Sequence, residues 1–216
     1  MLLPTTVLDP NHPDYPPALT PDRAADPRPF LHAIGDSRLL HRRALGLLAS
    51  IQCPGDAILR AYDLARELRD AGIPVIGGFH SPMEKECLAL LLRGRQPVII
   101  TPARGIEHMR VPAAWRPAID AGRILVVTPI EPHQRRVTAA LAERRNAFVG
   151  AASAALLLIH AAPGGRAERL ALSAIANGKA VFVAIDGGNS CLQAAGARLA
   201  VVADVRAELG PHLPHG

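Results

Sequence analysis

Two glycines and several polar residues follow the apolar run IPVI in the first half of the chain. They are Gly77, Gly78, His80, Ser81 and Glu84. Paired glycines let a backbone turn tightly and approach a ligand closely. Ser81 and Glu84 have the S-x-x-E spacing of a capping box, which predicts a helix start whose free N–H groups attract anions. The stretch predicts a phosphate-binding pocket or, in the simpler alternative, a turn in which Glu84 serves only as the cap.

A second glycine turn lies in APGGRAERLA, residues 162–171. Gly164 and Gly165 form the turn, and Arg166 begins the helix that follows. A basic residue in the first turn of a helix opposes the helix dipole. This placement indicates a bound anion that reverses the local charge, with solvation of the side chain as the alternative.

Two further groups of arginines accompany these turns. ERRNAFVG contains Arg144, Arg145 and Asn146, and helical spacing cannot place all three on one face. At least one of them must turn toward the rim of the fold or its core. In TPARGIEHMRVP, Arg104 and Gly105 directly follow an apolar run, where a guanidinium reaches the same rim.

No pair of nucleophile and base can be assigned. His80 and Ser81 are adjacent on a turn and point in different directions, while the remaining histidines of interest stand on separate loops. We find no two-carboxylate site, no metal-ligand cluster and no G-x-x-x-x-G-K-[ST] phosphate loop. The sequence therefore names no catalytic residue and no metal, favours a binding protein over an enzyme, and allows a bound nucleotide or phosphate as the cofactor.

Strands and helices must alternate to position these residues. Apolar runs at 46–52, 73–77, 96–101, 123–128, 154–160 and 179–185, with a seventh at 198–202, are separated by segments of helical period. The runs are continuous, so both faces of each strand are buried. This pattern predicts an α/β fold with a doubly wound, mainly parallel sheet of about six or seven strands. Ligands then bind at the carboxyl ends of the strands, on the loops at 77–82, 101–107, 128–135, 160–166 and 185–190.

Three segments divide the chain of 216 residues. Residues 1–40 are an irregular proline-rich leader that packs on the core, with one short strand near 30–34. Residues 41–205 form the α/β domain, with Asp56 expected to cap its first helix. Residues 206–216 are a tail, and no winged-helix domain is expected.

Composition restricts the compartment and the partners. The longest apolar run has about a dozen residues, whereas a membrane span needs roughly 20, and there is no secretory signal. Three scattered cysteines fit a reducing cytoplasm. Residues 93–145 hold ten arginines against four acids, a local charge of +6 within a net charge of +5. This clustering predicts an anionic partner, although an aromatic content of 3% counts against extensive base stacking.

Four stretches together resemble the DprA/Smf family of bacterial DNA-processing proteins, in that family's order. They are DYPPAL with its continuation, ERRNAFVGAAS, PGGRAERLALSAIANGKAVFVAI and NSCLQAAGA, between about Asp14 and Ala197. The resemblance implies a Rossmann-like fold of the wider group that also holds the lonely-guy enzymes. The chain departs from the family at residues 51–53, IQC, where the family has GSR, and in ARGIE, which stands one strand later than the similar family motif.

The resemblance also implies a function and partners. It implies single-stranded DNA binding, assistance in loading the RecA recombinase during DNA uptake or recombination, and a homodimer. Arg145 matches the first arginine of a family motif, which gives it either a phosphate-binding role or a structural one. A sensor for a nucleotide or a nucleotide derivative is the alternative function. A lonely-guy phosphoribohydrolase is disfavoured, because Arg166, Ala167 and Glu168 stand where such enzymes have a phosphate-binding Gly-Thr.

Overall fold

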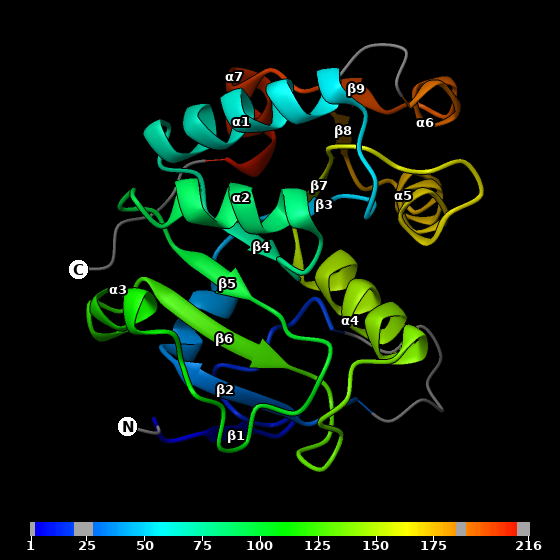
Figure 1. The fold of residues 1–216 in the computed structure, drawn as a ribbon. Coiled ribbons are helices and arrows are strands. Elements are labelled where there is room, and N and C mark those ends of the chain that lie inside the picture. The colour runs from blue at the N-terminus through cyan, green and yellow to red at the C-terminus, as the bar shows by residue number, and fades with distance from the viewer. Residues whose placement is uncertain (1–2, 20–27, 185–188, 211–216) are drawn as a thin grey trace.

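A single sheet organises the computed structural model, which describes residues 3–19, 28–184 and 189–210 (Figure 1). Within these residues the strand order is β1-β2-β6-β5-β4-β3-β7-β8-β9. The strands are β1 (Thr6–Leu8), β2 (Leu31–Gly35), β3 (Leu45–Leu48), β4 (Val75–Gly77), β5 (Val98–Ile100), β6 (Ile124–Thr128), β7 (Ala155–Leu158), β8 (Val181–Val183) and β9 (Arg198–Leu199).

The seven strands after residue 40 are parallel, as the sequence predicts. The leader adds two more, because β1 pairs antiparallel with β2 and β2 pairs antiparallel with β6. β2 is the short strand expected near 30–34. β1 was not predicted, since three residues beside prolines give no periodic signal.

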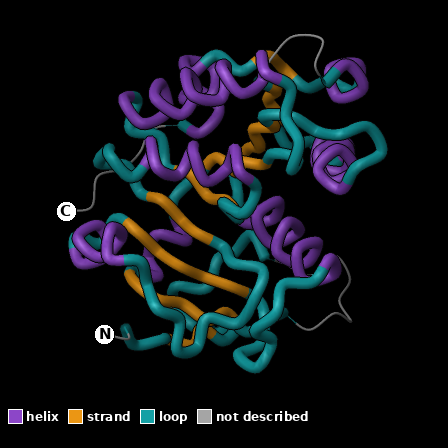
Figure 2. The backbone as a smooth tube through the Cα atoms, in the orientation of Figure 1, coloured by secondary structure: helices purple, strands orange, loops and turns teal. Residues whose placement is uncertain are grey.

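Helices cover both faces of the sheet (Figure 2). They are α1 (Gly55–Asp70), α2 (Pro82–Leu91), α3 (Arg116–Asp120), α4 (Ala139–Ala152), α5 (Arg166–Ala176), α6 (Ser190–Ala194) and α7 (Val202–Leu209), with the 3-10 helices η1 (Ser37–His41) and η2 (Ala113–Trp115). Side chains alternate along β6, where Ile124 and Val126 join one core and Leu125 and Val127 join the other.

Two hydrophobic cores therefore lie on opposite faces of the sheet. The first core, which contains Ile124 and Val126, packs against α1, α2, α3 and α7, and the second packs against α4, α5, α6, η1 and the leader. None of the helices in the described residues has the length and apolarity needed to cross a membrane.

Local predictions at both ends of the α/β domain differ from the structure. The first helix is capped at Pro54, and Asp56 lies inside its first turn, where its Oδ1 accepts the N–H of Ala57. The strand expected at 198–202 stops at Leu199, and α7 occupies residues that were assigned partly to a tail. Val205 and Leu209 of α7 are buried in the first core. Packing against distant segments stabilises a helix from Val202 onward, although the apolar run at 198–202 favoured a strand.

The connections reverse direction at β3. From β3 the chain adds β4, β5 and β6 on one side of the sheet, and it then returns through α4 to add β7, β8 and β9 on the other. The loops after β3 and β7 therefore diverge and leave a crevice at their carboxyl ends. In open α/β sheets, this switch point is where ligands bind.

Candidate functional site at the strand switch point

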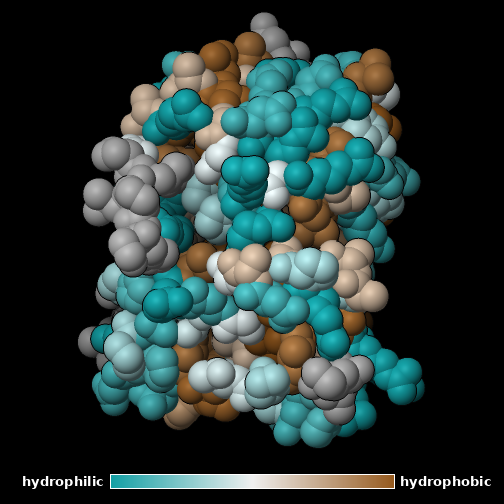
Figure 3. Space-filling view, turned by 90° about the vertical axis from the view of Figure 1, so that its left-hand side faces the viewer, coloured by the Kyte–Doolittle hydropathy of each residue, from teal (hydrophilic) through white to brown (hydrophobic). Residues whose placement is uncertain are grey.

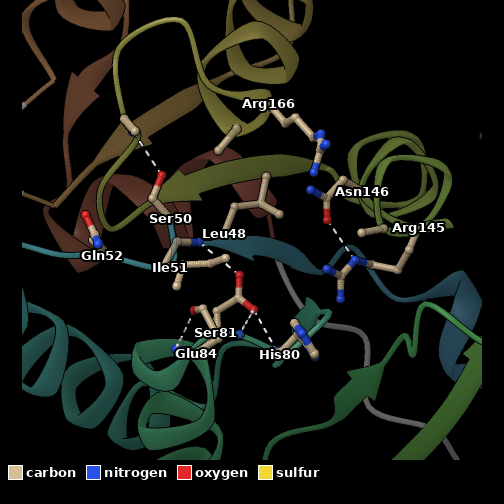
Figure 4. A pocket seen from close by; sticks show the side chains of 14 residues that line it. Leu48, Ser50, Ile51, Gln52, His80, Ser81, Glu84, Arg145, Asn146 and Arg166 are labelled. Carbon is tan, nitrogen blue, oxygen red and sulfur yellow. Dashed lines mark hydrogen bonds between the residues drawn. The ribbon is translucent and has the colours of Figure 1, made fainter. Parts of the chain in front are cut away.

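A cavity of about 470 Å³ occupies this crevice (Figure 4). We call it the first cavity. The end of β3 and the loop after it contribute residues 48–52, and α4 closes the cavity on one side. The remaining lining residues, from the segments after β4 and β7 and from α4, are His80, Ser81, Glu84, Ala162, Arg166, Ala167, Ala142, Arg145 and Asn146. Its volume falls in the range of roughly 300–1,000 Å³ that is usual for small-ligand sites.

Arg145 projects from α4 into this cavity (Figure 4). The residue is 5% exposed, its Nε donates to Asn146 Oδ1 over 2.7 Å, and its Nη1 donates to the carbonyl of Thr101 over 3.4 Å. Among the described residues it forms no ion pair. Burial lowers the pKa of its guanidinium, and the charge of Glu84 offsets this only in part. A buried cation without a carboxylate partner is unfavourable by itself and favours a bound anion.

Gly78 provides the space for this guanidinium. A Cβ atom at position 78 would lie 1.4 Å from Arg145 Nη1 and 2.1 Å from its Cζ. Any side chain there would occupy the volume that the guanidinium fills. The second glycine of the turn is therefore required by Arg145, a long-range reason that the turn itself does not reveal.

Glu84 is committed to backbone hydrogen bonds. Its Oε2 accepts the N–H groups of His80 and Ser81 at 2.8 and 3.2 Å, and Ser81 Oγ accepts the N–H of Glu84 at 3.2 Å. This is the capping box that the sequence predicts. In addition, Oε1 accepts the N–H of Ala49 at 3.0 Å, which ties α2 to the loop after β3. The carboxylate thus forms a wall of the cavity, with its charge satisfied by three donors.

Ser50 connects the two loops that diverge at the switch point. Its Oγ accepts the N–H of Ala162 at 2.9 Å, and its own N–H donates to the carbonyl of His160 at 2.9 Å. Sequence reasoning missed residues 48–52 as part of the site, because the apolar run predicts a strand up to residue 52. Their position directly after the strand at the switch point is the signal that could have identified them.

The glycine turn before α5 shapes the site without lining it. Gly164 has a φ of 66°, and its N–H donates to Glu168 Oε2 at 2.6 Å, while Gly165 is the N-cap of α5. Arg166 lies in the wall of the first cavity, as do His80, Ser81, Glu84, Arg145 and Asn146. The structure thus brings six of the predicted residues together.

The other predicted residues lie elsewhere. Arg144 is exposed and bound to Glu131 on both carboxylate oxygens, at 2.8 and 2.9 Å, which lowers the pKa of Glu131. Gly105 packs against residues 131–132 and donates to the carbonyl of Gln134 at 2.8 Å. Arg104 and Gly78 line a neighbouring cavity, and Gly77 ends β4.

Solved structures resemble this fold. DNA processing protein A (DprA) from Streptococcus pneumoniae is 18% identical with a TM-score of 0.76, and the match covers 96% of this chain and 75% of that one. DprA from Helicobacter pylori, described with a single-stranded DNA binding mode, is 20% identical with a TM-score of 0.68 over 91% of this chain and 92% of that one. The molybdenum cofactor carrier protein of Chlamydomonas reinhardtii is 14% identical with a TM-score of 0.53, covering 78% and 99% of the two chains.

A search of curated proteins gives no significant match. The sequence model described as DNA recombination-mediator protein A matches residues 6–208, which is nearly the whole chain. The match includes all four stretches in which the sequence resembles the DprA/Smf proteins, as well as every residue of the first cavity. The chain therefore belongs to the DNA recombination-mediator protein A family.

Proposed function

We propose that this protein binds single-stranded DNA in the first cavity, with the guanidinium of Arg145 holding a backbone phosphate. The observation that carries the proposal is the burial of this cation without an ion-pair partner among the described residues. A phosphate would supply the missing charge and accept charge-assisted hydrogen bonds. The family supports a role in DNA processing, and the H. pylori relative is described as binding single-stranded DNA.

The surroundings of Arg145 suit a phosphate. Asn146, His80 and Arg166 add polar or cationic groups around the same cavity (Figure 4). Glu84 is the one carboxylate in the cavity wall, and its three backbone donors offset its repulsion of an anion. The basic segment 93–145 attracts a polyanion over a longer range.

The proposed function also involves a recombinase, a second copy of the chain and a cellular compartment. We propose that the protein helps load the RecA recombinase onto single-stranded DNA in the cytoplasm, during DNA uptake or recombination, and that it acts as a homodimer. Family membership supports these steps. The short edge strands β1 and β9 leave backbone groups that a second copy could pair or cover. Recombinase-dependent ATP hydrolysis on protein-coated DNA and light scattering test the two steps separately.

A nucleotide sensor is the second candidate function. The first cavity has the size of a small-ligand site, and loops from three strands surround it. A free nucleotide would use the same guanidinium for its phosphate. The two functions differ in salt dependence, because a DNA strand releases many counterions on binding and a mononucleotide releases few.

Paired variants on α4 test the phosphate role. Arg145→Ala should weaken the binding of fluorescein-labelled oligo(dT), measured by anisotropy, by roughly 1–3 kcal/mol, the scale of a charge-assisted hydrogen bond. Its melting temperature should change little, because the variant removes a desolvated charge along with its two hydrogen bonds. Arg144→Ala is the matched control, since the adjacent arginine is exposed and already paired with Glu131.

Two results would contradict the proposal. One is a large fall in the melting temperature of Arg145→Ala while the folded fraction still binds DNA normally, which would make Arg145 a structural residue. The other is an equal loss of binding in both variants, which would assign the effect to net charge and not to the cavity. Binding of mononucleotides alone, insensitive to salt, would favour the sensor.

A further inference from the structure

A second cavity of about 360 Å³ adjoins the first. Its walls come from the loop after β4, the loop after β5 and the segment that leads through η2. Two residues, His80 and Arg145, line both cavities. They therefore form a partition, in which one buried cation and one exposed imidazole lie between two separate hollows.

The second cavity differs chemically from the first. Phe79, Met109 and Trp115 contribute apolar and aromatic surface, while the exposed Arg104 and Arg110 add cationic groups. Trp115 is the only tryptophan of the chain. Aromatic and apolar walls with arginines beside them are what a nucleobase attached to a phosphate chain requires.

The backbone at Phe79 supports a functional role for this partition. Phe79 has a φ of 45°, in the left-handed region that a bulky side chain rarely adopts, and its side chain is buried. Such strain persists where the surrounding structure enforces it, and it gathers at binding sites. Here it accompanies the turn that places Gly78 beneath Arg145 and His80 between the cavities.

We propose that the two cavities together bind one dinucleotide step, with the connecting phosphodiester on Arg145 at the partition and one nucleoside in each cavity. This inference rests on the proposed function and adds the position of the bound nucleic acid in the site. Consecutive nucleosides of the single-stranded DNA lie on opposite sides of the Arg145 guanidinium. Trp115 contributes the stacking surface of the second cavity. Bases joined by a phosphodiester occur in both DNA and RNA, so the ligand class is a single-stranded dinucleotide. The 2′-hydroxyl of the sugar distinguishes RNA from DNA as the source of this ligand.

Tryptophan fluorescence tests the second cavity in the wild-type protein. Because Trp115 is the sole tryptophan, its emission reports this cavity alone. Saturation with d(TpT) should quench the emission, and thymidine monophosphate at equal saturation of the first cavity should quench it less. Binding of oligo(dT) seen by anisotropy without any change in tryptophan emission would overturn the dinucleotide register while leaving DNA binding intact.

Competition experiments test the two-nucleoside size. Unlabelled d(TpT) should displace labelled oligo(dT) at a concentration about tenfold lower than thymidine monophosphate, since a stacked base contributes about 1.4 kcal/mol or more. Trp115→Leu should remove this advantage, whereas Leu59→Ala, on the exposed face of α1, should retain it. Equal potency of the two competitors in wild type would refute the proposal.

The source of the strand is resolved by comparing d(TpT) with r(UpU). A preference for either sugar keeps the dinucleotide site and assigns its ligand. If labelled oligo(dT) does not bind at all but dinucleotides still quench Trp115, the proposed DNA function fails and the two-cavity site stands. If neither oligo(dT) nor any dinucleotide binds, both proposals fall.

Discussion

Arg145 and Gly78 depend on each other for their positions. The guanidinium fills the space that a Cβ at position 78 would need. We predict that Gly78→Ala displaces the guanidinium and weakens oligo(dT) binding about as much as Arg145→Ala does. Since both changes act on one group, the double variant should be no weaker than the single ones. Anisotropy on the four proteins of this cycle measures the coupling.

A matched glycine controls for the general effect of adding a methyl group. Gly55 lies at the start of α1, where an added Cβ meets no atom within 4 Å. Gly55→Ala should leave DNA binding unchanged. Full additivity of Gly78→Ala and Arg145→Ala would show that the two residues act independently, against the overlap seen here.

The cysteines make a second prediction for single residues. Burial raises the pKa of Cys87 to about 12, whereas Cys191 is exposed. The reactive form is the thiolate, so Cys87 stays protonated and inert until the pH approaches that value or the protein unfolds. We expect a disulfide reagent at neutral pH to modify Cys191 rapidly and Cys87 only in denaturant, as measured by mass spectrometry of the labelled peptides. Rapid native labelling of Cys87 would contradict the burial of α2 against α1.

At the scale of secondary-structure elements, the side chain of Glu84 connects a helix to two loops. Its carboxylate holds the start of α2, the turn after β4 and the loop after β3 through three backbone N–H groups. Glu84→Ala leaves these donors without their acceptor and should lower the free energy of unfolding by about 3 kcal/mol. Urea unfolding measures this loss. Glu86→Ala on the same helix is the control, because Glu86 is exposed and accepts a hydrogen bond from Tyr62 Oη, at 3.1 Å, and not from the backbone of the neighbouring loops that the structure describes. A similar loss in both variants would mean that the three backbone hydrogen bonds of Glu84 are not the source of the effect.

Local patterns could predict most elements and the capping box of α2. Continuous apolar runs identify parallel strands because both sheet faces are covered, and Ser81 with Glu84 marks a helix start within four residues. The same rules failed for α7 and for the loop at 48–52, where packing against distant segments decides the conformation. Helical spacing predicts that one of residues 144–146 turns inward, but only the seating of α4 on the sheet selects Arg145. Which glycines line a cavity likewise depends on long-range contacts, as at Gly78.

At the scale of the whole molecule, exposed arginines lie at both ends of β5. Arg104 and Arg110 follow β5 and line the second cavity, while Arg93 and Arg95, which are also exposed, precede the same strand. Figure 3 views the molecule from the side on which β5 and β6 begin, and this face is mostly hydrophilic with scattered hydrophobic patches. Arg93 and Arg95 add to the net charge, but they precede the amino end of β5, whereas the switch-point loops follow the carboxyl ends of the strands.

These two pairs of arginines allow direct phosphate contacts to be distinguished from long-range attraction by the net charge of the protein. Arg104→Gln with Arg110→Gln, and Arg93→Gln with Arg95→Gln, both reduce the formal net charge from +5 to +3, that is 5 minus 2. Each phosphate contact contributes about one unit to the dependence of log affinity on log salt, so the first pair should lower this slope by about two units. The second pair should leave the slope nearly unchanged and reduce only the association rate at low salt. Anisotropy titrations of oligo(dT) across a salt series give both slopes, and equal slopes for the two double variants would show that the strand does not cross the carboxyl-end rim.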